Sequence, residues 1–254
     1  MKRYLCTVQY IGKNYCGYQN QDNGVSIQQK IEEALEIAFK QKIEIFASGR
    51  TDAGVNAYAQ TFHFDADSTI PAPKVPFAVN MFLPEDIKIL DCKQVSDSFN
   101  ARFDVKKKTY EYNIYVSPVE LPVKNMFAYH IQKMPDIDKM KQCANLLVGE
   151  HNFKAFMSAG GQSKTFVRKI YSIKIKQKQN DISIEVTGNG FLYNMVRIIV
   201  GTLLEVGFGR KTIEDVKNAL DTQQRKLAGY LVPAHALFLK SVKYWFLVHI
   251  DKCI

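Results

Sequence analysis

Hydrophobic and polar residues alternate in several short runs over the first hundred positions, and one longer stretch has helical spacing instead. Alternation at every second position is typical of strands with one buried face. It covers residues 5–10, 43–47, 58–64 and 87–95. Ser26 and Gln29 stand at capping-box spacing before an apolar stripe over residues 27–39, which predicts a helix. A second, short helix is expected around residues 77–82.

The second half repeats this order of elements with insertions. Strands are predicted at residues 109–116, 169–176, 182–187 and 237–242. Helices are predicted behind the capping residue Asp136 and over residues 191–206 and 212–220. Each half therefore has a β-α-β-β-α-β order, the ferredoxin-like unit. The sequence predicts an α+β fold of two such halves, 1–104 and 105–254, with a mostly antiparallel sheet flanked by helices and an active-site cleft between the halves.

Composition and charge narrow the class of protein. The 254 residues are 46% hydrophobic and 23% charged, which is typical of a globular protein and excludes disorder and fibres. The net charge of +9 favours a polyanionic partner such as nucleic acid, although lysine-rich surfaces also serve solubility. Five scattered cysteines without a paired motif indicate reduced thiols. We find no signal peptide or membrane-spanning stretch and expect a cytoplasmic protein.

The sequence does not match several common motifs for nucleotide or metal binding. Gly188 and Gly190 begin a dinucleotide fingerprint, but Tyr193 occupies the place of its third glycine. Residues 209–212 resemble the end of a phosphate-binding loop only superficially and are better explained as a helix start. No two histidines stand at metal-binding spacing along a helix. Hydride transfer, nucleotide hydrolysis and zinc chemistry thus lose their usual sequence support, and no metal is expected.

One loop between two predicted strands carries candidate chemistry. Gly49 and Gly54 bracket the string Arg50-Thr51-Asp52, which permits a tight turn with an unusual backbone conformation. Catalytic groups often lie on loops carried by a rigid sheet. An ordinary hairpin with a capping aspartate and a solvated arginine would have the same residues, so the string alone leaves both explanations open.

The string from Gly49 to Ala57 resembles the signature loop of the tRNA pseudouridine synthase A family, G-R-T-D-A-G-V-H-A, in eight of nine positions. The exception is Asn56, where the family has His. Five further blocks resemble the family in order along the chain. They cover residues 10–19 (with Ile11 and Tyr18 for the usual Asp and Trp), 99–103 (with Asn100 for the usual His), 108–112, 194–201 and 236–239.

The resemblance implies an isomerase that converts uridine to pseudouridine in the anticodon stem-loop of tRNA, at nucleotides 38–40, as a homodimer and without metal or organic cofactor. It places the catalytic aspartate at Asp52, the tyrosine that packs against the target base at Tyr110, and an arginine that helps displace the base or hold the RNA backbone at Arg50. The spacing of Tyr110 and Tyr112 on one strand face does not separate these two tyrosines. A carboxylate can attack the ribose or the base, or act as a base on the ribose, and the sequence leaves these routes open.

Arg197 lies in an otherwise apolar helical run, where a charge is seldom buried without a partner. Asp52 needs a cation to stay ionised in a closed pocket. We therefore expect an ion pair between Arg197 and Asp52. Phosphate contacts are expected from three basic clusters, each of which could also be a solvated surface run. The clusters are Lys106, Lys107 and Lys108; Lys164, Arg168 and Lys169; and Arg210 and Lys211.

Two other functions remain to be weighed. A noncatalytic RNA-binding protein of the RNA-recognition-motif kind has the same topology, but residues 188–193 fail to match its aromatic signature. A pseudoenzyme that only binds RNA is the second alternative, and the retained Arg50, Asp52, Tyr110 and Arg197 argue against it. Asn56 and Asn100 remove two potential imidazolium contacts to RNA and leave the catalytic assignment intact.

Overall fold

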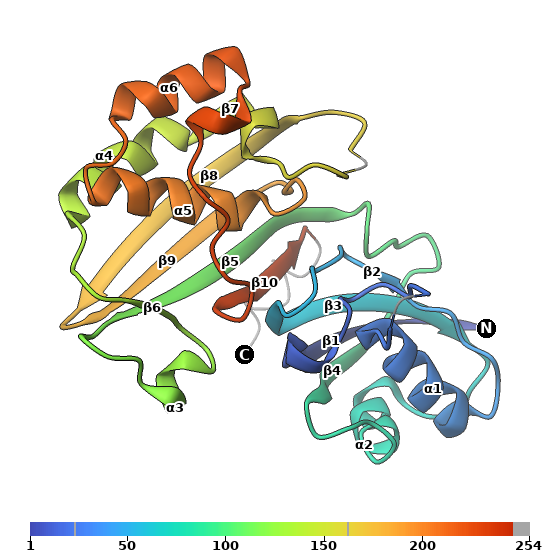
Figure 1. Cartoon of the computed structure of the whole chain (residues 1–254). Coiled ribbons are helices and arrows are strands. Elements are labelled where there is room, and N and C mark those ends of the chain that lie inside the picture. The colour runs from blue at the N-terminus through green and yellow to red at the C-terminus, as the bar shows by residue number, and fades with distance from the viewer. Residues whose placement is uncertain (23, 162, 246–254) are drawn as a thin grey trace, which may run out of the picture. The chain divides into compact units, whose positions relative to one another are not determined.

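The computed structural model describes residues 1–22, 24–161 and 163–245 (Figure 1). The chain divides into two compact units. Unit 1 contains residues 1–106 together with the described residues from 239 onward, and unit 2 contains residues 107–238. Helices and mostly antiparallel strands make up both units. The predicted α+β class is thereby confirmed.

Unit 1 is built on strands β1 (Lys2–Tyr10), β3 (Asn56–Ala66) and β4 (Ile87–Val95), in the order β4-β1-β3. Both pairings are antiparallel. The short β2 (Phe46–Ala47) pairs with β3, and β10 (Leu237–Tyr244) is also a neighbour of β3. Within unit 1, β10 therefore lies beside strands that end more than 140 residues earlier in the chain.

Two helices, α1 (Ile27–Phe39) and α2 (Val75–Val79), complete unit 1. The α1 start follows the prediction, because the Ser26 side chain accepts a hydrogen bond from the backbone N–H of Gln29 at 3.0 Å. The predicted capping box is half correct. The Gln29 side chain donates to Glu33 one turn further along instead of returning to the helix start.

The strand predicted at residues 43–47 forms only at Phe46–Ala47. Ile43 and Ile45 are buried, as their alternation indicates, but the backbone N–H of Ile45 donates to a carboxylate oxygen of Glu32 at 3.1 Å. A backbone group that bonds to a side chain is lost to a strand ladder. The apolar alternation here marks burial and not sheet pairing.

Unit 2 contains β5 (Val105–Val116), β9 (Asp181–Gly188), β8 (Val167–Lys178) and β7 (Gly149–Asn152), paired antiparallel in that order. The adjacency of β5 and β9 is the strand order of a ferredoxin-like unit. A three-residue strand, β6 (Tyr129–Ile131), runs parallel to β5. The short β6 and β7 have too few residues to produce a pattern and were not predicted.

The helices of unit 2 are α3 (Pro122–Asn125), α4 (Ile137–Leu147), α5 (Met195–Gly207) and α6 (Ile213–Thr222). Figure 1 shows α4, α5 and α6 on the same side of β5, β8 and β9. Asp136 caps α4 as predicted, through bonds to two backbone N–H groups. Short 3-10 turns occur at Gly12–Asn14, Ala72–Lys74, Lys154–Phe156 and Arg225–Leu227.

The predicted start of α5 at residue 191 is wrong by one turn. Asn194, just before the helix, has a left-handed backbone with φ 60°, which no helix interior adopts. Its side-chain amide donates to Ser158. Phe191 instead packs its ring against Tyr110. The apolar residues before Asn194 therefore serve packing, and the helix begins at Met195.

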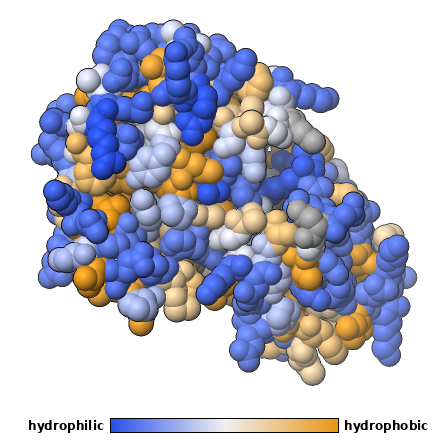
Figure 2. Space-filling model, in the orientation of Figure 1, coloured by the Kyte–Doolittle hydropathy of each residue, from blue (hydrophilic) through white to orange (hydrophobic). Residues whose placement is uncertain are grey.

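Within the described part of the chain, no helix is long and apolar enough to cross a membrane. Four cysteines there, Cys6, Cys16, Cys92 and Cys143, are free thiols, whereas Cys253 lies outside the described residues. The same residues contain no group of side chains able to hold a metal ion. Most of the face drawn in Figure 2 is hydrophilic, with hydrophobic residues gathered over α2 at the lower right.

Candidate active site

Asp52 lies in unit 1, on the loop that joins β2 to β3, and is partly buried. A turn begins at this residue, since the backbone N–H of Val55 donates to the Asp52 carbonyl at 3.1 Å. Gly54 supplies the positive φ of 76° that the turn requires. Asp52 also forms an isolated antiparallel bridge with Gly17. The carboxylate is thus carried by a closed turn that rests on another segment.

The Gly12 backbone clamps one side of this loop. A Cβ added at Gly12 would lie 2.1 Å from the carbonyl oxygen of Val55, so only glycine permits this approach. The Gly12 N–H donates to the Asn56 side-chain oxygen at 2.9 Å. Asn56 is only 1% exposed. Asn56 therefore anchors the loop, and its side chain has a structural role.

The other side of the loop is held at Thr51, the residue before Asp52. Its carbonyl accepts from the backbone N–H of Tyr18 at 3.0 Å, and its hydroxyl bonds to the Tyr10 hydroxyl at 2.8 Å. Gly17 has φ 128°, and a Cβ there would lie 3.1 Å from the Thr51 carbonyl oxygen. Gly17 in turn accepts from the first residue of α1. The aspartate is held by the backbone on both sides.

Buried polar side chains form the base of the loop. The Gln60 amide donates to the Gly49 carbonyl at 2.8 Å and accepts from the Ser48 hydroxyl at 2.5 Å. Gln60 is fully buried on β3. A buried amide with satisfied donors and acceptors rigidifies its surroundings. The loop start is therefore fixed to the sheet and not merely laid over it.

Arg50 is exposed, and within the described residues its side chain has no hydrogen bond or ion pair. Two residues from Asp52, a guanidinium of this kind can reach a partner outside the protein. Its five donors suit a phosphate or a nucleobase edge.

Two tyrosines of β5 differ in their surroundings. Tyr112 is fully buried, its hydroxyl donates to the Pro233 carbonyl at 2.9 Å, and burial raises its pKa. Tyr110 is 9% exposed, and its ring meets Phe191 edge to face with the centroids 5.3 Å apart. Tyr112 is thus committed to the core, which favours Tyr110 as the tyrosine of the site.

Arg197 lies in the first turn of α5 in unit 2 and is partly buried. Its Nε donates to the Val232 carbonyl at 2.8 Å, and its Nη1 donates to the Asn194 side-chain oxygen at 2.7 Å. Two bonds to fixed oxygens leave the guanidinium little freedom to rotate. Its pairing with Asp52 would join the two units and stays a prediction.

Gly201 explains how the Val232 carbonyl is placed. A Cβ at Gly201 would lie 1.9 Å from the carbonyl oxygen of Tyr230, so α5 admits the backbone of this segment only at a glycine. The Gly229 N–H donates to the Thr202 hydroxyl at 2.7 Å. Sequence reasoning gave neither Gly12 nor Gly201 a role, although both lie in the blocks that resemble the family.

The basic residues expected at phosphates fall into two groups. Lys106, Lys107, Lys164 and Lys169 are exposed, and the Lys107 ammonium lies 4.9 Å from the centre of the Tyr171 ring. Others have intramolecular partners. Arg168 donates to the carbonyls of Thr165 and Val167, Arg210 pairs with Glu205, Lys211 donates to the Lys226 carbonyl, and Lys108 has a partner as well.

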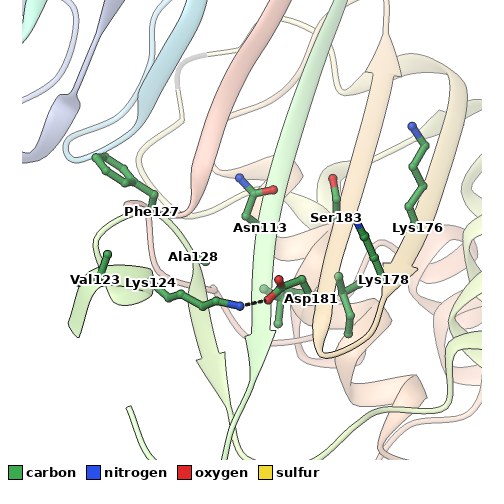
Figure 3. Close-up of a pocket in the computed structure, with 11 residues that line it drawn as sticks. Asn113, Val123, Lys124, Phe127, Ala128, Lys176, Lys178, Asp181 and Ser183 are labelled. Carbon is green, nitrogen blue, oxygen red and sulfur yellow. Dashed lines mark hydrogen bonds and ion pairs between the residues drawn. The ribbon is translucent and has the colours of Figure 1, made fainter. Parts of the chain in front are cut away.

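A hollow of about 420 Å³ opens between α3 and strands β5, β8 and β9 of unit 2 (Figure 3). Lys124 of α3 points across it to Asp181, and the two charged groups lie 2.5 Å apart. Asn113, Ser183, Lys176 and Lys178 line the strand side. None of the site residues expected from the sequence lines this hollow, so it is a feature separate from the candidate active site.

Known proteins resemble this chain over nearly its whole length. A family model described as tRNA pseudouridine synthase matches residues 7–104 and 143–245. tRNA pseudouridine synthase A 2 of Clostridium tetani (strain Massachusetts / E88) is 45% identical over 93% of this chain and 96% of its own length. tRNA pseudouridine synthase A of Anoxybacillus flavithermus (strain DSM 21510 / WK1) is 41% identical over 96% of this chain and 99% of its own. Among solved structures, an archaeal box H/ACA sRNP Nop10–Cbf5 complex matches at 11% identity, over 91% of this chain and 58% of that chain, with a TM-score of 0.37.

Proposed function

This chain belongs to the tRNA pseudouridine synthase family, whose members are isomerases, and from that premise we propose which nucleotide it modifies and how. The substrate is the anticodon stem-loop of tRNA, the product is pseudouridine at nucleotides 38–40, and Asp52 is the catalytic residue. No metal or organic cofactor takes part. The protein works in the cytoplasm as a homodimer.

One observation carries the assignment of Asp52: its loop is clamped between Gly12 and Gly17, with Asn56 and Thr51 bonded on either side. Holding a reacting group within a fraction of an ångström of its productive position contributes strongly to catalysis. An ordinary hairpin has no need of such close backbone contact on two sides.

The reaction rearranges one nucleotide without net change of composition. The bond between N1 of uracil and C1′ of ribose breaks, the base turns, and C5 bonds to C1′. The C5 proton then leaves and N1 carries a proton in the product, so atoms balance. Asp52 acts in its ionised form, either by attacking the ribose or the base or by removing a proton from the ribose.

Arg197 and Tyr110 complete the proposed site. Arg197 supplies the positive charge that keeps Asp52 ionised. Its two bonds to the Val232 carbonyl and to Asn194 aim the guanidinium and use only part of its donors. The Tyr110 ring packs against the target base, while Phe191 braces that ring from the side.

Arg50 helps to displace the base or holds the RNA backbone, and the exposed lysines neutralise phosphates. The net charge of +9 supports this role. Affinity for tRNA should fall steeply with salt, because each neutralised phosphate adds about 0.7–0.9 to the slope of log K against log salt. A flat salt dependence would show that the basic clusters do not bind the RNA.

Release of tritium from unmodified tRNA labelled at uracil C5 tests the proposal, because the C5 hydrogen must leave when pseudouridine forms. The wild type should release tritium, and Asp52→Asn, which keeps the shape but not the charge of the side chain, should lose activity by at least ~10³-fold. tRNA binding by Asp52→Asn serves as the control and should persist. Binding by the wild type without any release would favour the noncatalytic RNA-binding protein instead.

A further inference from the structure

Phe103 is a large apolar side chain that is exposed to solvent. It is 76% exposed, whereas Phe99 and Ala101 of the same block are buried. The neighbouring Arg102 is exposed too, with its guanidinium carbon 5.8 Å from the centre of the Phe103 ring. The buried half of this block fixes it to unit 1, and the exposed half presents an aromatic ring with a cation beside it.

The turn that presents these two residues is closed by its own hydrogen bonds. The Asn100 side-chain oxygen accepts from the backbone N–H groups of Arg102 and Phe103, at 2.9 and 3.3 Å. The Asn100 N–H donates to the Asp104 carboxylate at 2.7 Å, and the Asp104 N–H donates back to the Asn100 carbonyl at 3.0 Å. Asn100 thus shapes the turn, and little ordering remains when a ligand meets the exposed ring.

Ala101 ties the turn to the sheet of unit 1. Its N–H donates to Nδ1 of the buried His63 at 3.2 Å, and its carbonyl accepts from the Tyr244 hydroxyl at 2.9 Å. The same hydroxyl bonds to the Thr61 hydroxyl on β3 at 2.7 Å.

From Thr61 the bonds continue to the loop of Asp52. The Thr61 N–H donates to the side-chain oxygen of Gln60 at 3.0 Å, and the Gln60 amide donates to the Gly49 carbonyl next to Arg50. A chain of hydrogen bonds, buried except for the partly buried last one, therefore connects the turn of Arg102 and Phe103 with the loop of Arg50 and Asp52. The turn and the loop are therefore held by the same hydrogen-bond network, and each carries exposed residues.

We propose that Phe103 and Arg102 form a platform on which an unpaired base of the tRNA, other than the target uridine, stacks. The inference rests on the proposed function for the identity of the RNA. Every base has a π-face, and an exposed ring on a preformed turn stacks on it without further rearrangement. The guanidinium adds a cation beside the same base and a donor for its phosphate. The platform thereby helps to select which uridine enters the site.

Unit 1 offers a matched control. Phe77 on α2 is 72% exposed, and the Lys74 ammonium lies 5.6 Å from its ring centre. It has the same chemistry as Phe103, but the turn of Phe103 alone shares the buried bonds of the Asp52 loop. Phe77→Ala therefore removes an equal ring from a place where no stacked base is expected.

The test is the affinity of the full-length protein for an unmodified tRNA anticodon stem-loop, measured by fluorescence anisotropy. Phe103→Ala should raise Kd about 10-fold, within the ~5- to 150-fold that loss of one stacked base produces. Phe103→Trp should restore the wild-type Kd, and Phe77→Ala should leave it unchanged.

An unchanged Kd in Phe103→Ala overturns the platform. So does a raised Kd that Phe103→Trp fails to restore, because a stacking ring must rescue a lost stack. A fall in molar mass by light scattering in Phe103→Ala with Kd unchanged would assign the ring to contact between copies of the chain. Binding of RNA does not depend on catalysis. Absence of tritium release by the wild type would therefore contradict the proposed function, whereas the platform is tested by the Kd values alone.

Discussion

The two units hold their charged site residues in different ways. In unit 1 the backbone around Asp52 is clamped, by close approach at Gly12 and by hydrogen bonds to Val55, Asn56 and Thr51. In unit 2 the charged group itself is held, because the Arg197 guanidinium donates to a carbonyl and to an amide oxygen. Under the proposed function Asp52 is the group that reacts, and its position is set by contacts of the loop backbone. Arg197, whose proposed role is to orient and balance charge, can fill that role while its guanidinium is bonded directly.

Both arrangements depend on a glycine that lets two backbone segments touch. Gly12 admits Val55 in unit 1, and Gly201 admits Tyr230 in unit 2. The first contact places the Asp52 loop directly, whereas the second places the segment of Val232, which in turn holds Arg197. A substitution at Gly12 should therefore displace the Asp52 loop directly, whereas a substitution at Gly201 should displace Arg197 only through Val232.

The largest effects are expected from Gly12→Ala and Gly201→Ala. In each variant the new Cβ meets a backbone oxygen, at 2.1 and 1.9 Å, which cannot move aside as a flexible side chain would. We expect a loss of about 2–4 kcal/mol in the free energy of unfolding, from urea titration. Gly190→Ala is the control, since the nearest atom lies 3.8 Å away. Wild-type stability in Gly12→Ala would contradict the clamp.

A smaller loss is expected from Asn56→Ala. This change leaves the buried Gly12 N–H without its acceptor, which costs about 1–3 kcal/mol. Asn100→Ala removes an acceptor from backbone N–H groups that water can reach, so it should cost less than about 1 kcal/mol. Urea titration compares the two. Equal losses would show that burial does not distinguish the two asparagines.

Acid should weaken unit 1, because a titratable acceptor, His63, holds the turn of Ala101 to the sheet, whereas the two bonds of Arg197 go to oxygens that do not titrate. Burial, and next the charge of Arg3, lower the pKa of His63, whose Nδ1 accepts from Ala101. A depressed histidine pKa means that the unfolded chain binds the proton more readily. This contribution to stability is complete above a pH of about 6.5 and is lost as pH falls below it. The urea midpoint should drop more between pH 7.5 and 5.5 in the wild type than in His63→Asn.

The smallest expected effect is a gain in stability, in the variant Tyr18→Phe. The Tyr18 hydroxyl is buried and, among the described residues, has no hydrogen-bond partner. Its backbone N–H holds Thr51, but its side chain contributes only the ring. Tyr18→Phe removes the unsatisfied hydroxyl and should stabilise the protein by up to about 1 kcal/mol, seen as a higher urea midpoint. Destabilisation would reveal a partner for the hydroxyl.

The sequence predicted those elements whose pattern and packing agree. Strand β4 spans residues 87–95 as expected, although its alternation and its pairing with β1 shift between Ile89 and Asp91. The prediction failed where apolar residues are buried or pack against a neighbour without belonging to the strand or helix that their pattern indicates. Ile43 and Ile45 are buried without a ladder, because Glu32 takes the Ile45 N–H. Phe191 braces Tyr110 in place of starting α5.

For the candidate site, the resemblance supplied residues but not the reason for their arrangement. Asp52 and Arg197 could be named from their motifs, yet the clamp at Gly12 and the role of Asn56 depend on contacts between positions more than 40 residues apart. Such contacts leave no trace in local spacing. Asn56 and Asn100 illustrate this, since both fill backbone roles that are invisible in a motif alignment.

The position of β10 has a consequence for biosynthesis. This strand is a neighbour of β3, and its Tyr244 packs with Leu5 and Phe99 in one core cluster. Unit 1 therefore cannot finish folding when its first 106 residues leave the ribosome, because part of its core is translated only after the whole of unit 2. An N-terminal domain usually folds first during synthesis. Here the core of unit 1 is completed last, so a nascent chain that stops before β10 lacks Tyr244 and its bonds to Thr61 and Ala101.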